Sequence, residues 1–82
     1  MVRYAVEVDA IFRENTKKPN TLCQHLETIE GLKSYDEALR CAQNNARWYY
    51  KRYFGLIDRQ LCYAEARFMD ENGEYTVTTF GK

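Results

Sequence analysis

Apolar and polar residues alternate along residues 2–12, VRYAVEVDAIF. The apolar positions are Val2, Tyr4, Val6, Val8, Ala10 and Phe12, and the charged positions between them are Arg3, Glu7 and Asp9. A period of two in a stretch rich in β-branched and aromatic residues is typical of a strand with one buried face. The pattern therefore predicts a strand over residues 2–12 whose charged side chains lie in water.

Residues 13–20, RENTKKPN, are polar and hold the only proline, which predicts a loop. The next stretch, residues 21–30, fits two structures. Leu22, Leu26 and Ile29 have helical spacing, whereas the length of the segment and its place after a strand and a loop suit the second strand of a hairpin. We prefer the strand and keep the helix as the alternative. The strand would have two faces, with Leu22, Leu26 and Thr28 on one and Cys23 and His25 on the other.

The clearest helix begins after Ser34. The Ser34 hydroxyl can accept the backbone N–H of Glu37, whose carboxylate can reach back to Ser34, and Asp36 also favours the start of a helix. Gly55 supplies the left-handed residue at which many helices end. These features predict a helix over about residues 35–54.

The predicted helix has two distinct faces. The first face combines tyrosines with alanines and one leucine: Tyr35, Ala38, Leu39, Ala42, Ala46, Tyr49, Tyr50 and Tyr53. We expect this face to pack on the sheet, with the tyrosine rings mostly in the core and with Ala64 and Ala66 leaving room for them. The second face, here called the basic ridge, carries basic and polar residues with a tryptophan at its margin: Arg40, Asn44, Arg47, Trp48, Lys51 and Arg52.

The basic ridge is the predicted partner-binding site. Tryptophan and arginine are enriched at the centres of protein interfaces. The alternative is a solvated helix exterior without a partner, because the outward faces of helices are routinely charged.

Residues 60–69 and 75–80 are predicted to form a second hairpin. Asn72-Gly73 is a preferred pair for a two-residue type I′ turn. Such a turn would place Phe68 opposite Val77. The apolar face of this hairpin would then hold Cys62, Ala64, Ala66, Phe68, Tyr75 and Val77, and the wet face would hold Glu65, Arg67, Thr76 and Thr78.

The elements therefore follow the order β-β-α-β-β within a single domain, residues 1–82. We predict an α+β fold in which the helix packs on one face of a small antiparallel sheet of three to four strands, because each element has one apolar face to bury.

Twelve basic residues balance twelve acidic ones, which argues against a nucleic-acid-binding surface that covers the whole domain. Residues 33–55 nevertheless carry five basic residues and only two acidic ones. A weak nucleic-acid-binding module that uses the basic ridge is therefore the alternative function. Such a module would stack bases on Trp48 and contact phosphates with the neighbouring cations.

The candidate chemistry is sparse. Cys23, His25, Cys41 and Cys62 form a ligand set that zinc accepts, but they lack the paired C-x₂-C spacing of zinc motifs. We predict separate cysteines, no metal and no cofactor. Glu7, Asp9 and Glu65 predict an acidic, solvated sheet surface. A Cys–His nucleophile pair has no recognisable oxyanion-hole segment or orienting group, so we predict that the chain is not an enzyme.

These observations favour a small non-catalytic binding or regulatory protein that acts through protein–protein contacts. An accessory or phage-type inhibitor and a homodimer are two forms that such a protein can take. The start of the chain does not resemble a signal peptide, and no apolar run has membrane-spanning length. We therefore expect a cytoplasmic protein with a protein partner and no membrane contact.

Overall fold

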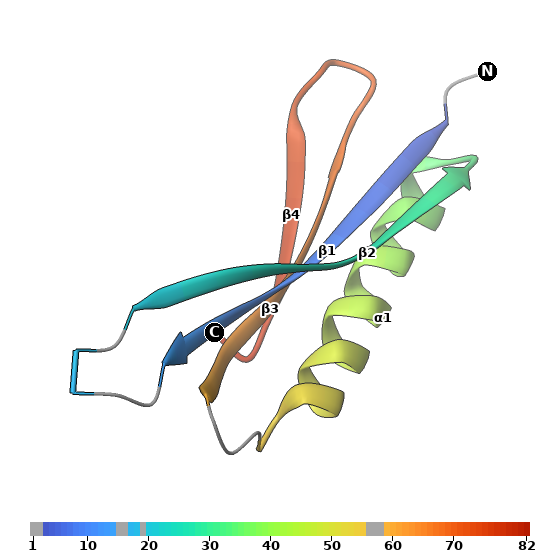
Figure 1. Ribbon diagram of the computed structural model, residues 1–82. Coiled ribbons are helices and arrows are strands. Elements are labelled where there is room, and N and C mark those ends of the chain that lie inside the picture. Colours follow the sequence, from blue (N-terminus) through green and yellow to red (C-terminus); the bar gives the residue numbers. More distant parts are fainter. Residues whose placement is uncertain (1–2, 15–16, 19, 56–58) are drawn as a thin grey trace.

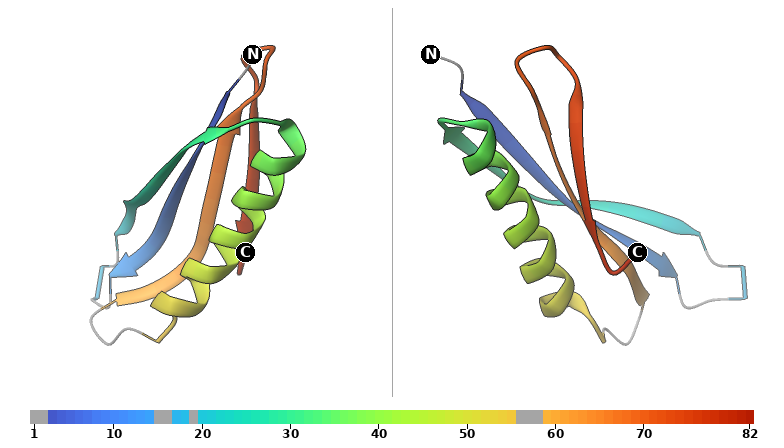
Figure 2. Two further views of the ribbon diagram at one scale, coloured as in Figure 1. Left: turned by 90° about the vertical axis from the view of Figure 1, so that its right-hand side faces the viewer. Right: turned by 180° about the vertical axis from the view of Figure 1, so that it is seen from behind.

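The computed structural model describes residues 3–14, 17–18, 20–55 and 59–82. Its elements are β1 (Tyr4–Glu14), β2 (Thr21–Leu32), α1 (Tyr35–Tyr53), β3 (Arg59–Met69) and β4 (Tyr75–Phe80). The four strands form one antiparallel sheet in the order β2-β1-β3-β4, and α1 lies on one face of it (Figure 1 and Figure 2). The predicted α+β fold with β-β-α-β-β order is confirmed. Val2, part of the first predicted strand, lies outside the described residues.

The strand interpretation of residues 21–30 is confirmed, but the assignment of its faces is partly wrong. The register of β2 against β1 shifts twice, and Leu26 is the extra residue at one of these shifts. As a result Leu26 and Ile29 both pack against the core, whereas Thr28 pairs with Glu7 on the opposite face. Bulges of this kind add one residue each, so an apolar spacing of three or four residues appears in a strand. The three-residue spacing between Leu26 and Ile29, which resembles that of a helix, therefore results from the bulge at Leu26.

The loop predicted at residues 13–20 is shorter than expected. Arg13 and Glu14 continue β1, and the Glu14 N–H donates to the Asn20 carbonyl at 3.1 Å. Residues 15, 16 and 19 of the predicted loop lie outside the described residues.

The caps of α1 agree with the prediction, with one difference. The Glu37 N–H donates to the Ser34 hydroxyl at 3.1 Å, but the Glu37 carboxylate accepts the N–H of Lys33, also at 3.1 Å, rather than that of Ser34. At the other end Gly55 has φ +91°, which is the left-handed conformation that the sequence predicts. These caps define both ends of the helix.

Alanines rather than tyrosines form the centre of the helix–sheet contact. Ala38, Ala42 and Ala46 are fully buried, and they share one core cluster with Ala64 and Ala66 of β3. Small side chains on both sides let the helix approach the sheet closely. The expectation that the tyrosine rings fill the core is therefore wrong in part. Tyr49, Tyr50 and Tyr53 are half-buried at its margin, and Tyr35 is exposed.

The predicted register of the second hairpin is wrong by one residue. Phe68 lies opposite Thr76, and Val77 lies opposite Arg67. The turn is a three-residue loop, because the Gly73 N–H donates to the Asp70 carbonyl and the Asp70 N–H donates to the Glu74 carbonyl. A slip of one residue moves every side chain of a strand to the other face.

Asp70 explains the choice of turn. Its Oδ1 atom accepts the N–H groups of Asn72 and Glu74, both at 2.9 Å. Aspartate at the first position of a type I turn stabilises that turn, and Gly73 with φ +80° completes the loop. Tyr75 and Val77 consequently lie on the face away from α1, not on the apolar face where we expected them.

Candidate functional site

All six residues of the predicted partner-binding site are exposed. The basic ridge consists of Arg40, Asn44, Arg47, Trp48, Lys51 and Arg52, and it runs along the outward face of α1. Trp48 is 54% exposed even though it is the largest side chain of the helix. The predicted division of the helix is therefore confirmed for this face, since the basic side chains point to water and the neighbouring tyrosines are half-buried.

Ring and cation contacts hold Trp48 in a fixed setting. The Arg52 guanidinium lies 5.4 Å from the centre of the indole ring, and the Tyr49 ring meets Trp48 edge-on at 4.8 Å. Tyr49 in turn stacks with Tyr53 at 6.1 Å. An aromatic side chain that is already held by its neighbours loses little conformational entropy when a partner covers it.

A shallow, open depression lies beside Trp48. It is lined by Glu27 of β2 and by four helix residues, Asn44, Asn45, Trp48 and Tyr49. The Tyr49 hydroxyl donates to the Glu27 carboxylate at 2.7 Å, and this hydrogen bond, with partial burial, raises the pKa of Tyr49 to about 12. The Asn45 amide donates to the Cys41 carbonyl at 2.8 Å. Two polar groups that line the depression, the Tyr49 hydroxyl and the Asn45 amide, therefore already have hydrogen-bond partners.

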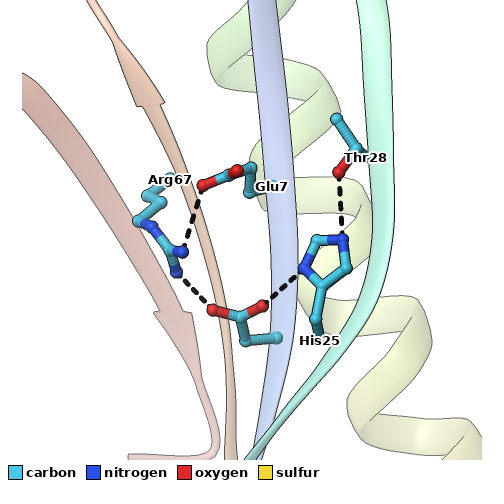
Figure 3. Close-up of polar contacts among 5 residues, drawn as sticks. Glu7, His25, Thr28 and Arg67 are labelled. Atoms are coloured by element: carbon cyan, nitrogen blue, oxygen red, sulfur yellow. Dashed lines mark hydrogen bonds and ion pairs between the residues drawn. The ribbon is translucent and has the colours of Figure 1, made fainter.

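A second cluster lies on the other face of the sheet, where α1 does not reach (Figure 3). The central residue is Asp9, which is only 3% exposed. Its Oδ1 atom accepts a hydrogen bond from His25 Nδ1 at 2.9 Å, and its Oδ2 atom accepts one from Arg67. Arg67 also contacts the Glu7 carboxylate at 3.0 Å. The prediction that Asp9 lies in water is wrong, because side chains from both neighbouring strands cover it.

Burial and pairing act in opposite directions on Asp9. Burial alone raises the pKa of a carboxyl group, but the hydrogen bonds from Arg67 and His25 lower the pKa of Asp9 by more, so its pKa lies below its ordinary value. The same contact with Asp9 raises the pKa of Arg67. Asp9 is thus a buried carboxylate whose desolvation is offset by its contacts with Arg67 and His25.

The predicted acidic sheet surface of Glu7, Asp9 and Glu65 is also corrected by this cluster. Arg67 lies directly opposite Glu7 in the β1–β3 ladder, and its guanidinium neutralises part of the negative charge. The alternation along each strand places both residues on the outer face. The pairing of β1 with β3 brings them together, and the local pattern does not specify that pairing.

His25 links the buried carboxylate to a hydroxyl group. Its Nε2 atom lies 2.9 Å from Thr28 Oγ1, so hydroxyl, imidazole and carboxylate follow one another in the order that activates a nucleophile in some enzymes. Acyl transfer also needs fixed donors for the developing oxyanion and a site that excludes water. Thr28 and His25 are exposed on an open sheet face. We therefore interpret the cluster as one that keeps Asp9 buried and charged.

The three cysteines lie on separate elements. Cys23 lies near His25 on the outer face of β2, Cys41 is on α1, and Cys62 lies at a register shift in β3. Burial raises the pKa of both the Cys23 and the Cys41 thiols, which disfavours the thiolates. Within the described ranges, no three His, Cys, Asp or Glu side chains are grouped so that they would hold a metal ion.

Comparisons with protein-family models, with curated protein sequences and with solved structures found no match to this chain. In the part of the chain that the structure describes, α1 is not apolar enough to cross a lipid bilayer.

Proposed function

We propose that this chain is a small non-catalytic binding protein that regulates a protein partner by docking its basic ridge onto an acidic surface of that partner. Inhibition by covering such a surface is the simplest form of this regulation, because one helix face is enough to exclude other ligands from it. The observation that carries the proposal is the exposure of Trp48 among four cations on the outward face of α1.

The position of Trp48 supports binding better than packing. A tryptophan of this size in an 82-residue domain would add a large stabilising area if it were turned inward. Instead it lies on the helix exterior, with Arg52 over the ring and an open depression beside it. Aromatic and arginine side chains in such settings contribute most of the binding free energy in many interfaces.

The charge on the ridge supports an acidic partner. Arg40, Arg47, Lys51 and Arg52 lie along the same helix, and the acidic residues of α1, Asp36 and Glu37, lie in its first turn, away from Trp48. Complementary charge speeds association and selects among partners. The ridge therefore predicts an association rate that falls as the salt concentration rises.

Affinity capture from extracts of the source organism tests the proposal. The immobilised baits are the wild-type chain, Trp48→Ala, the charge reversal Arg47→Glu with Lys51→Glu, and a control that reverses the same number of charges at Lys17 and Lys18. The captured protein is then purified, and its affinity for each bait is measured. We expect Trp48→Ala and the ridge reversal each to weaken binding by about tenfold or more, and the control to change it little. Because Trp48 is exposed, the circular dichroism spectrum of the Trp48→Ala variant should match that of the wild-type chain.

Equal binding by all four baits would refute the ridge as the docking surface. Single-stranded oligonucleotides provide the competing arm of the test. Nucleic-acid binding would replace the proposal if two results were found together. The chain would bind the oligonucleotides with an affinity that falls steeply with salt and is lost on the ridge reversal, and no protein would be captured in a way that depends on Trp48.

A further inference from the structure

The two edges of the sheet differ in how well they are protected against pairing with another strand. The β2 edge shifts register twice against β1 and carries the acidic residues Glu27 and Glu30. The β4 edge, YTVTTF, has no charged residue, no proline and no register shift against β3. Charges and bulges are the usual features that keep edge strands from pairing. Only β2 has them.

Exposed apolar side chains gather at the unprotected edge. Tyr75 is 59% exposed and Val77 is 51% exposed, both on the face of β4 away from α1, whereas the exposed Phe80 lies on the α1 face with its ring 5.3 Å from that of Tyr50. Met69, which pairs with Tyr75 from β3, is a further exposed apolar residue. The slip in the hairpin register created this patch, because it turned Tyr75 and Val77 away from α1. A six-residue, uncharged segment with high β-propensity is an aggregation hazard unless it is paired.

We propose that β4 pairs in antiparallel fashion with β4 of a second copy of this chain, so that the two four-stranded sheets join into one sheet of eight strands. A second copy fits this edge because antiparallel pairing about a two-fold axis places the strand against itself, and β4 has no charge that would then face a like charge. In the described part of the chain no element lies beyond β4 (Figure 1).

The hydrogen-bonding pattern of β4 limits the possible registers. The Asp70 N–H donates to the Glu74 carbonyl, so in the alternating antiparallel ladder Thr76 and Thr78 direct their backbone groups toward β3. The backbone groups of Tyr75, Val77 and Thr79 then point to the free edge. Pairing of the two edges therefore requires that these odd-numbered residues face one another across the two-fold axis.

The bounds of β4 select among the registers that remain. The strand ends at Phe80, because Gly81 has φ +92° and Lys82 Nζ lies 4.9 Å from the centre of the Tyr63 ring on β3. A two-fold axis at Thr78 places Val77 opposite Thr79 and Thr76 opposite Phe80, so residues 76–80 of each copy pair and Glu74 stays outside the new ladder, whereas an axis at Val77 would place the Glu74 carboxylate opposite Phe80. Thr78 faces its own copy at a non-hydrogen-bonded position, where side chains approach most closely.

The pairing has a consequence for the shape of the dimer. A two-fold axis perpendicular to a continuous sheet keeps each face on the same side, so both α1 helices lie on one face of the joined sheet. The two basic ridges then point the same way, and a repetitive or dimeric ligand can engage both of them at once. The dimer itself rests only on the β4 edge and does not depend on what the ridges bind.

Sedimentation or light-scattering measurements from low micromolar to near-millimolar concentrations test the dimer. We expect the mass of the wild-type chain to approach that of two copies as concentration rises, and Val77→Lys to remain monomeric with an unchanged circular dichroism spectrum. Leu22→Lys removes an exposed leucine from the opposite edge, β2, and is the matched control, which should still form the dimer. A wild-type mass of one copy throughout, or a dimer that survives Val77→Lys, would overturn the proposal.

Cross-linking tests the register. In a background with Cys23, Cys41 and Cys62 changed to serine, Thr78→Cys should form a disulfide between two copies when oxidised glutathione accepts the two electrons and two protons of the thiols. Thr76→Cys, on the same face of the same strand, lies opposite Phe80 of the other copy and should cross-link far less. Equal cross-linking of the two variants would rule out the pairing of Thr78 with itself.

Discussion

The two faces of the sheet are buried by different means. On the face that α1 covers, Val6, Val8 and Phe68 are buried by contact with the helix and with one another. On the other face no helix of the described residues lies over the strands, and yet Asp9 is only 3% exposed. Its cover consists of polar side chains from β2 and β3.

This difference teaches that a thin two-layer domain can bury part of its open face without a third layer. The covered face is stabilised by the removal of apolar surface from water, which depends little on pH or salt. The open face is stabilised by a few directed contacts between charged groups, which depend on the protonation state of each partner. The two faces should therefore respond differently to mutation and to acid.

The largest effect should follow from truncation on the covered face. Phe68→Ala removes a fully buried ring that contacts Tyr4 and Tyr35, and it leaves a cavity beneath the helix. We expect a loss of about 3–5 kcal/mol in the free energy of unfolding, measured by urea denaturation. Leu22→Ala, at an exposed leucine, is the control and should cost less than about 1 kcal/mol. Similar losses for the two variants would show that the covered face does not hold the core.

The next largest effect should follow from breaking the cluster on the open face. Arg67→Met keeps the length of the side chain but leaves the buried Asp9 carboxylate with His25 as its remaining partner. We expect a loss of about 2–3 kcal/mol in the free energy of unfolding, because a buried charge without its partner is strongly destabilising. The double variant with Asp9→Asn should lose less than the sum of the two single changes. Additive losses would mean that Asp9 and Arg67 act independently.

Lowering the pH should reduce the stability that the open face contributes and leave the contribution of the covered face unchanged. Because the pKa of Asp9 is lower in the folded chain than in the unfolded chain, the stability it contributes is present above the unfolded value of about 3.9 and is lost as the pH falls through the lower folded value. Urea midpoints of the wild-type chain should therefore fall with pH in this range. In Asp9→Asn this part of the acid dependence should be absent, and an unchanged acid dependence would contradict the assignment.

The amino-acid sequence predicts the elements of this fold well, because their signals are local. The cap at Ser34, the stop at Gly55 and the alternation after Tyr4 each depend on neighbouring residues, and the structure contains all three features. The exposed basic ridge follows from the same helical period. Local patterns thus account for the element order and for the exposed surface of α1, but not for the open face of the sheet.

Contacts between strands are the part that local patterns miss. The burial of Asp9 depends on the pairing of β1 with β3, which brings Arg67 across from residues distant in the sequence. The shifts in β2 depend on how apolar residues such as Leu26 reach a core that is already formed. The register of β4 depends on a competition between two turns that both suit the segment containing Asn72-Gly73, and Asp70 decides it through its side chain.

The smallest effect we predict tests that competition directly. In the three-residue loop Gly73 has φ +80° whereas Asn72 does not have a positive φ, and a Cβ atom at Gly73 would meet nothing within 4 Å. Gly73→Ala should therefore cost about 1–2 kcal/mol from backbone strain alone, and Asn72→Ala should change the free energy of unfolding by less than about 0.5 kcal/mol. A two-residue type I′ turn requires positive φ at both residues, so in that turn both substitutions would be costly. Urea denaturation of the two variants thus reports which turn forms, and with it whether Val77 lies on the open face or beneath α1.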